Sequence, residues 1–106
     1  MGRRIVLGPI DQVEPGQANK FDVPGVGAVA VYCVDRQYYA TSDECTHGVA
    51  SLSADGVLQG HVIECGWHGG QFDIRTGAFL CPPCTAPLKV FPVTVDGSML
   101  TITVDA

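Results

Sequence analysis

The sequence has 106 residues, which is enough for one compact domain and too few for two. Hydrophobic residues make up 46% of the chain and charged residues 16%, a balance typical of a folded protein and not of a disordered one. Eleven acidic and six basic residues give a net charge of −5, and no segment concentrates Lys or Arg. The charge disfavours nucleic acid as a partner and favours a protein with a basic face.

Neither a secretory signal nor a membrane span is predicted. Arg3 and Arg4 are followed by an apolar run of only Ile5–Leu7, which is too short for a signal peptide. No run approaches the roughly 20 apolar residues that a membrane span needs. The chain has five cysteines, an odd number, so metal ligation in a reducing cytoplasm is favoured over a disulfide framework. We therefore expect a cytoplasmic monomer.

Three hairpins are predicted from segments rich in β-branched and aromatic residues. In chain order their strands are Ala28–Val34 with Tyr38–Thr41, Val62–Cys65 with Gln71–Ile74, and Val90–Val95 with Met99–Val104. The first pair flanks a turn at Asp35–Arg36, and the third flanks Asp96–Gly97, a dipeptide suited to a tight turn. Apolar residues recur at helical spacing over no useful window, and Gly or Pro interrupts nearly every candidate segment. An all-β fold is expected.

Two Cys/His pairs form the strongest chemical pattern, Cys45-Thr46-His47 and Cys65-Gly66-Trp67-His68, each at the end of a predicted strand. Two thiolates and two imidazoles can bind either a single zinc ion or a [2Fe–2S] cluster. Zinc fingers place paired cysteines on one arm and paired histidines on the other, whereas each arm here carries one of each. The mixed pairing matches a cluster in which one iron takes both thiolates and the other both imidazoles. The pattern favours that cluster, with a structural zinc-binding interaction module as the alternative.

The remaining His and Cys residues are assigned no ligand role. His61 precedes a predicted strand and is interpreted as a solvated residue. Cys81 and Cys84 form a Cys-x-x-Cys, but Pro87 discourages the helix that a redox dithiol needs, so they are interpreted as packing residues or incidental thiols. Cys33 lies in an alternating strand and is interpreted as a small buried residue.

The segments Glu44-Cys45-Thr46-His47-Gly48 and Glu64-Cys65-Gly66-Trp67-His68-Gly69-Gly70-Gln71-Phe72-Asp73 resemble Rieske-type ferredoxins of bacterial aromatic-ring-hydroxylating dioxygenase systems. The resemblance extends over nearly the whole chain in length and strand pattern. It implies an all-β Rieske fold of antiparallel sheets, with a β-sandwich-like base and a small loop-rich cluster-binding subdomain at about 43–84 within a single domain, 1–106. It implies one [2Fe–2S] cluster per chain, held by Cys45, His47, Cys65 and His68.

The resemblance also implies a role. Such a ferredoxin is not an enzyme but a soluble carrier of single electrons, from a flavin-containing ferredoxin reductase to a terminal Rieske non-heme iron oxygenase. The small Rieske subunit of an assimilatory nitrite reductase shares the motif and stays as an alternative.

Respiratory Rieske proteins resemble the chain in ligand spacing but differ around the cluster. They carry an extra cysteine in each loop, where this sequence has Ala50 and Trp67, so their disulfide is not expected here. Their serine and tyrosine hydroxyls match Gly70 and Phe72, so two hydrogen bonds that stabilise the reduced state are not expected either. These differences predict a reduction potential of about −150 mV. In the family a proline-containing loop covers the cluster, so the Pro82–Pro83 segment is expected to shield it.

Overall fold

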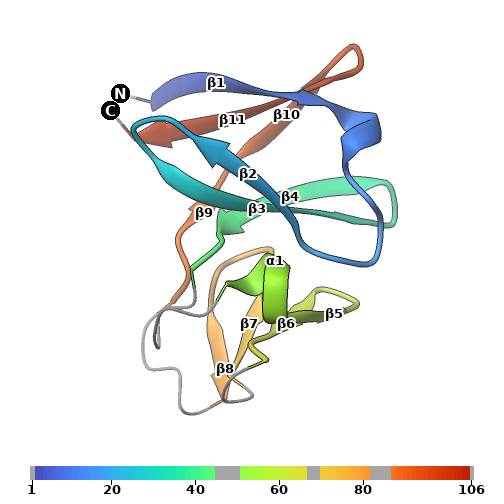
Figure 1. Ribbon diagram of the computed structural model, residues 1–106, viewed down its shortest axis with the longest axis vertical. Coiled ribbons are helices and arrows are strands. Elements are labelled where there is room, and N and C mark those ends of the chain that lie inside the picture. The colour runs from blue at the N-terminus through green and yellow to red at the C-terminus, as the bar shows by residue number, and fades with distance from the viewer. Residues whose placement is uncertain (1, 45–50, 67–69, 82–86, 106) are drawn as a thin grey trace.

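The computed structural model describes residues 2–44, 51–66, 70–81 and 87–105, with only the backbone of Cys81 and Asp105. Three antiparallel sheets make up most of the described chain (Figure 1). The terminal sheet has the order β1 (Gly2–Pro9), β11 (Met99–Asp105), β10 (Val93–Asp96). The central sheet has the order β2 (Asn19–Val23), β3 (Gly27–Val34), β4 (Gln37–Ser42), β9 (Val90–Phe91). The short-stranded sheet has the order β5 (Val57–Gln59), β6 (Val62–Glu64), β7 (Gln71–Asp73), β8 (Phe79–Cys81).

Two short helices complete the described elements: a 3₁₀ turn at Ile10–Gln12 and the one-turn helix α1 at Leu52–Asp55. The all-β prediction of antiparallel sheets is therefore confirmed. The prediction that 43–84 forms a cluster-binding subdomain of a single domain stays a prediction, although β5 to β8 and α1 all lie inside that range. No helix in the described part of the chain is long and apolar enough to cross a membrane.

Strand β3 lies between two hydrophobic cores because its alternate side chains face opposite sides of the central sheet. Val29 and Val31 are fully buried in a core shared with Leu100 and Ile102 of β11. Ala30 and Tyr32 are fully buried in a second core, shared with Ile63 of β6 and Phe72 of β7 among others. A strand covered on both faces needs a nearly continuous apolar sequence, and Ala28–Val34 supplies it. The terminal and short-stranded sheets thus cover opposite faces of the central sheet.

The hairpin between β3 and β4 has the predicted turn. Val34 pairs with Gln37, and the two residues between them have positive φ angles, 52° at Asp35 and 66° at Arg36. Positive φ at both central residues is the type I′ geometry that matches the twist of paired strands. The prediction of this hairpin is confirmed, as is that of the β6–β7 hairpin.

The third predicted hairpin needs a correction. Val90–Val95 is not one strand, because Pro92 separates β9, which pairs with β4, from β10, which pairs with β11. Proline has no N–H to donate to a sheet, and here its carbonyl oxygen accepts a hydrogen bond from Thr103 N at 3.0 Å. The turn is also shifted by one residue: Asp96 pairs with Met99, so the two turn residues are Gly97, with φ of 63°, and Ser98.

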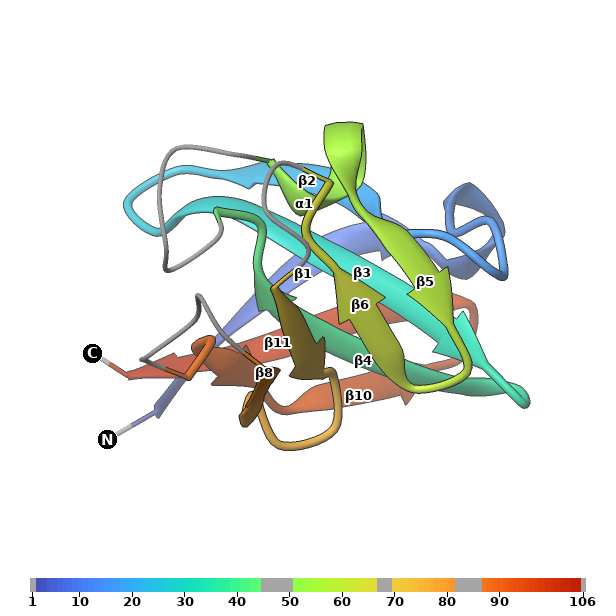
Figure 2. The same ribbon diagram turned by 90° about the horizontal axis from the view of Figure 1, so that it is seen from below.

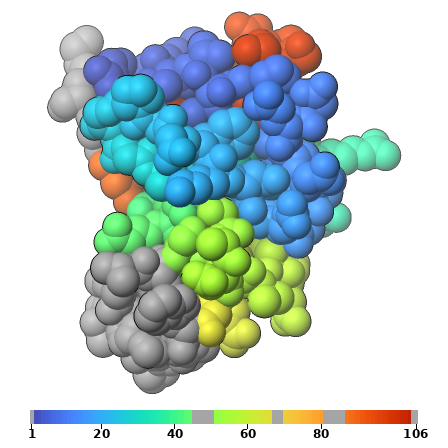
Figure 3. Space-filling view, viewed as in Figure 1, coloured from blue at the N-terminus to red at the C-terminus, as the bar shows by residue number. Residues whose placement is uncertain are grey.

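The chain leaves the central sheet and returns to it at adjacent points. It leaves after β4 and comes back in β9, which pairs with β4 through Ala40 and Thr41. Ser42 N donates a hydrogen bond to Lys89 O at 2.8 Å, directly beside this pair. Seen from below, α1 and the short-stranded sheet lie over the central sheet (Figure 2). The α1 helix and the short-stranded sheet therefore pack on one side of the central sheet, and the space-filling view shows this green and yellow part of the chain below the blue strands (Figure 3).

Candidate metal centre

The β6–β7 hairpin places Cys65 at its open end. Glu64 pairs with Gln71, and Gln71 Nε2 donates to Glu64 Oε1 at 3.3 Å. One residue further, Cys65 N donates a hydrogen bond to Gly70 O at 2.7 Å. The backbone on both sides of segment 66–70 is thus fixed by sheet hydrogen bonds, and a metal ligand at Cys65 has a rigid base.

The Cys65 side chain is 2% exposed and belongs to the second core. Its fully buried companions include Leu52 of α1, Ile63 of β6 and Phe72 of β7. The described structure places no disulfide on Cys65. A buried thiol with an apolar wall on one side fits a sulfur-ligated metal group, because that wall keeps water from the sulfur and lowers the local dielectric constant.

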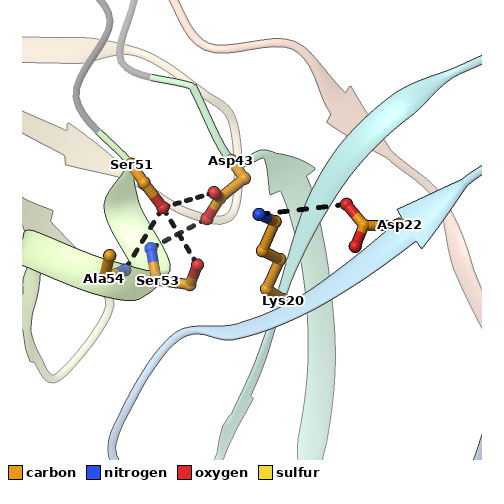
Figure 4. Close-up of polar contacts among 6 residues, drawn as sticks. All are labelled: Lys20, Asp22, Asp43, Ser51, Ser53 and Ala54. Carbon is orange, nitrogen blue, oxygen red and sulfur yellow. Dashed lines mark hydrogen bonds and ion pairs between the residues drawn. The ribbon is translucent and has the colours of Figure 1, made fainter.

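The first Cys/His pair follows directly after a buried carboxylate. Asp43 is 2% exposed, and its Oδ2 accepts a hydrogen bond from Ser51 Oγ at 2.5 Å while its Oδ1 accepts one from Ser53 N at 2.8 Å (Figure 4). Its backbone oxygen accepts a further bond from Leu52 N at 2.7 Å. Glu44 and Ser51 form an isolated antiparallel bridge. Both ends of the segment 45–50 are therefore attached to the start of α1.

Of the four predicted ligands, only Cys65 belongs to the described residues. Cys45, His47 and His68 lie outside them, so the assignment of the ligand set stays a prediction. The same holds for the predictions at Ala50, Trp67, Pro82, Pro83 and Cys84. Cys81 is described in its backbone only, on β8 opposite Gln71.

The interpretations of His61 and Cys33 were incomplete. His61 is partly buried, and its ring meets that of Tyr39 edge to face with the centroids 5.6 Å apart. It lies in the two-residue turn between β5 and β6, at the end of β6 opposite Cys65. Cys33 is partly buried at the edge of the first core and not fully buried. Both residues lie outside the candidate site.

The contacts of three residues around the site were not predicted from the sequence: those of Asp43 and Ser51 at the start of α1, and that of Gly66 with Asp55. Ser51 carried a signal that could have been used, since a serine directly before a short apolar–polar segment is a typical helix N-cap. In the structure Ser51 Oγ accepts a hydrogen bond from Ala54 N at 3.2 Å. The contacts of Asp43 and Gly66 depend on tertiary structure and have no local signal.

Two ionisable groups near the site have shifted pKa values. Burial raises the pKa of Tyr32 far above its ordinary value; the hydrogen bond to Thr41 Oγ1, 2.9 Å long, opposes this rise, and the nearby Asp43 adds to it. Hydrogen bonds from the Arg75 side chain lower the pKa of Asp73, at the far end of β7. The phenol thus stays protonated and the carboxylate stays charged at neutral pH.

Comparison with known proteins gives a consistent result. Residues 3–92 match the family model of the Rieske [2Fe–2S] domain. The chain is 47% identical over 96 residues to the ferredoxin component of the p-cumate 2,3-dioxygenase system of Pseudomonas putida, covering 91% of this chain and 81% of that protein.

Solved structures agree. A ferredoxin of Sphingomonas yanoikuyae B1 superposes with a TM-score of 0.90 at 38% identity, covering 97% of this chain and all of that one (100%). The ferredoxin in a complex of reduced oxygenase and oxidized ferredoxin of carbazole 1,9a-dioxygenase superposes with a TM-score of 0.85 at 42% identity, covering 93% and 91%. A protein described as a nitrite reductase small subunit has a TM-score of 0.78 at 22% identity, which establishes a common fold alone. The chain belongs to the Rieske [2Fe–2S] domain family, among the ferredoxin components of aromatic dioxygenase systems.

Proposed function

We propose that this chain is a soluble, low-potential Rieske ferredoxin that carries single electrons from a flavin-containing ferredoxin reductase to the terminal oxygenase of an aromatic-ring-hydroxylating dioxygenase. The similarity to ferredoxin components over most of both chains carries the proposal. A related ferredoxin, 42% identical, has been solved in complex with its oxygenase, which supports the assignment of that partner. The aromatic substrate binds to the oxygenase, so this chain transforms no substrate.

Cys45, His47, Cys65 and His68 are the residues that would hold the cluster. Both thiolates would bind one iron and both imidazoles the other, as in the family. When bound, the cluster supplies a centre that accepts and releases one electron. The buried Cys65, fixed through its backbone N–H to Gly70 O, supports this role for the second Cys/His pair.

The residues of the second core would set the environment of the cluster. Phe72 is fully buried in the same core as Cys65 and offers no hydroxyl, and the neighbouring Gly70 has no side chain. Hydrogen bonds to the sulfur atoms stabilise the reduced, more negative state, so their absence at these two positions favours a potential near the lower end of the Rieske range, about −150 mV.

The chain's charge and cysteines support the remaining parts of the proposal. A net charge of −5 would steer a monomeric carrier towards basic faces on the reductase and the oxygenase, at the cost of sensitivity to salt. Cys33, which forms no disulfide in the described structure, suits the reducing cytoplasm.

The test uses the purified protein as isolated. We expect a reddish-brown protein with two irons per chain, a low average g-value in the electron paramagnetic resonance spectrum of the reduced form, and a potential near about −150 mV. After reduction, it should be reoxidised by the oxygenase component of an aromatic-ring dioxygenase in stopped-flow mixing, more slowly as salt is added. Cys65→Ser serves as the variant that should lose this signal.

Three results would contradict the proposal. A colourless protein with zinc in place of iron would indicate the structural zinc module. A stoichiometric complex with a large partner that persists through gel filtration would indicate the nitrite-reductase subunit. A cluster that dioxygenase reductases do not reduce and dioxygenase oxygenases do not reoxidise would exclude the carrier role.

A further inference from the structure

Helix α1 connects the two halves of the candidate metal centre. Its first turn is attached to Asp43, two residues before Cys45. Its last residue, Asp55, lies against Gly66, the residue after Cys65. Between these ends, Leu52 packs fully buried in the same core as the Cys65 side chain. The helix therefore contacts Asp43 at its start and Gly66 at its end, two described residues that lie next to the two Cys/His pairs in the sequence; Figure 1 shows α1 beside β6.

The Asp43 carboxylate makes the attachment at the first end. It accepts hydrogen bonds from Ser51 Oγ and from Ser53 N, one on each oxygen, and it is 2% exposed. Ser51 Oγ also accepts a bond from Ala54 N and lies 3.1 Å from Ser53 Oγ. In Figure 4 the four residues form one connected group at the start of the helix. Hydrogen bonds to an ionised acceptor are stronger than neutral ones, so this group is stiff.

The absence of a side chain at Gly66 makes the close approach at the second end possible. A Cβ on Gly66 would lie 2.0 Å from Asp55 O and 3.0 Å from Asp55 C. Both atoms belong to the backbone, so no flexible side chain could move aside. Gly66 thus lies directly against the end of α1, while Asp43 is hydrogen-bonded to its start.

We propose that Asp43 is a positioning residue of the cluster site, which holds the first Cys/His pair at a fixed distance from the second through α1. Asp43 acts on the site through the helix and does not bind the cluster. The proposal rests on the proposed function, in which Cys45, His47, Cys65 and His68 hold the cluster. It assigns to α1 the role of a spacer whose two contacts, Asp43–Ser51 and Asp55–Gly66, set the separation of the pairs.

A carboxylate is the side chain that fits this position best. Both of its oxygens accept, one from an O–H and one from an N–H. In Asp43→Asn one oxygen could still accept from Ser53 N, but an amide N–H₂ facing Ser51 Oγ would leave the Ser51 O–H without its present acceptor. We expect Asp43→Asn to keep part of the positioning effect on the cluster site and Asp43→Ala to lose it.

The test compares cluster-loaded Asp43→Ala, Asp43→Asn, Ser51→Ala and the double variant Asp43→Ala/Ser51→Ala with the wild type. Asp22→Ala is the control, because Asp22 is an exposed carboxylate whose only described ion pair is with Lys20 at 3.9 Å (Figure 4). The measurements are the rate of cluster bleaching by an iron chelator, the electron paramagnetic resonance spectrum of the reduced protein, the reduction potential, and the unfolding temperature.

Asp43→Ala should bleach about tenfold faster than the wild type, with a broadened spectrum and a shifted potential, and Asp43→Asn should lie between the two. Ser51→Ala should change in the same direction by a smaller factor. Since both residues act through one contact, the double variant should bleach no faster than Asp43→Ala alone. Asp22→Ala should match the wild type in every measurement.

Asp43→Ala with wild-type bleaching, spectrum and potential would overturn the proposal, and so would a lower unfolding temperature as its only effect. If Asp43→Ala cannot be isolated with a cluster, Ser51→Ala provides the test. An unchanged spectrum and bleaching rate in Ser51→Ala would then overturn the proposal. A wild-type protein without iron would overturn the proposed function itself, and this proposal with it.

Discussion

The carbonyl oxygen of Asp55 lies only 2.0 Å from the position that a Cβ on Gly66 would take. Gly66→Ala must therefore push the second ligand segment away from α1. We expect a loss of about 1–3 kcal/mol in the free energy of unfolding, as for other overpacked sites, and fewer irons per chain. Chemical denaturation and iron analysis measure the two effects.

A matched control is Gly97→Asn, in the turn between β10 and β11. Gly97 has nothing within 4 Å of its would-be Cβ, and its φ of +63° is one that asparagine tolerates. Equal iron content and stability in Gly66→Ala and in the control would contradict the steric argument.

Phe72→Tyr should raise the reduction potential. Respiratory Rieske proteins are expected to have, at the position of Phe72, a tyrosine whose hydroxyl donates a hydrogen bond near the cluster, and the ring here is fully buried in the same core as Cys65. A new bond to a charged group, about 1.5–3 kcal/mol, corresponds to an increase of roughly 65–130 mV for one electron. Redox titration measures the shift. Phe21→Tyr, on β2 at the first core, should leave the potential unchanged.

Tyr32→Phe should lower the free energy of unfolding by about 1 kcal/mol at neutral pH, because it removes the buried hydrogen bond to Thr41 Oγ1. Thr41 keeps its own bond to Ser42 O, at 2.9 Å. Urea denaturation measures the loss. Tyr39→Phe, which removes only an exposed bond to Gln37, should cost less.

The effect of Tyr32→Phe should depend on pH in a defined direction. Burial raises the pKa of Tyr32 above its unfolded value of 10.0, so the native state holds this proton more tightly. The resulting stability is fully present below pH 10 and is lost as the pH rises above it. The difference between wild type and variant should therefore shrink in denaturation at alkaline pH. A difference that grows there would contradict the assignment.

Arg75→Gln should weaken the protein's stability mainly above about pH 4. Arg75 donates to both carboxylate oxygens of Asp73, at 3.0 and 2.9 Å, and lowers the pKa of that carboxyl below its ordinary 3.8. Such stability is present above the unfolded pKa and is lost as the pH falls through the folded one. Denaturation between pH 6 and pH 2.5 should show the two curves converging in acid.

The solvent exposure of Arg75 gives this prediction a second test. Its side chain is 53% exposed, so added salt should reduce the difference between wild type and variant. Arg4→Gln, an exposed change on β1 without a described ion pair, is the control. Curves that run parallel down to pH 2.5 would show that the pair does not link stability to pH.

The missed strands share their place in the sheets, since all of them lie at edges; the two remaining edge strands, β9 and β10, fall in the predicted segment Val90–Val95. β3, β4, β6, β7 and β11 are flanked by strands on both sides, and each falls in a predicted hairpin. The four missed strands, β1, β2, β5 and β8, all lie at sheet edges. Edge strands bury little, as the mostly exposed β1 and β5 illustrate, so their sequences carry weak alternation. Each of these strands is held in its sheet by hydrogen bonds to a single neighbouring strand, which the strand's own sequence does not reveal.

The residues of the candidate site also differ in whether the sequence alone predicts their role. The ligand set Cys45, His47, Cys65 and His68 is a prediction from residue type and spacing, because ligand chemistry requires those residue types. The role of Asp43 could not be predicted, since it depends on helix α1, which begins nine residues further along and which no periodicity predicts. The split of Val90–Val95 could have been predicted from Pro92, which cannot donate to a central ladder.

The hydrogen bond from Ser42 N to Lys89 O has a consequence for how such proteins diversify. Only this short distance separates the points where the chain departs from the base and rejoins it. Segment 43–89 could therefore be exchanged between related ferredoxins through two junctions that lie side by side, leaving the register of β4 and β9 intact. A chimaera of this kind would exchange the segments that carry the four proposed ligands while keeping the terminal and central sheets.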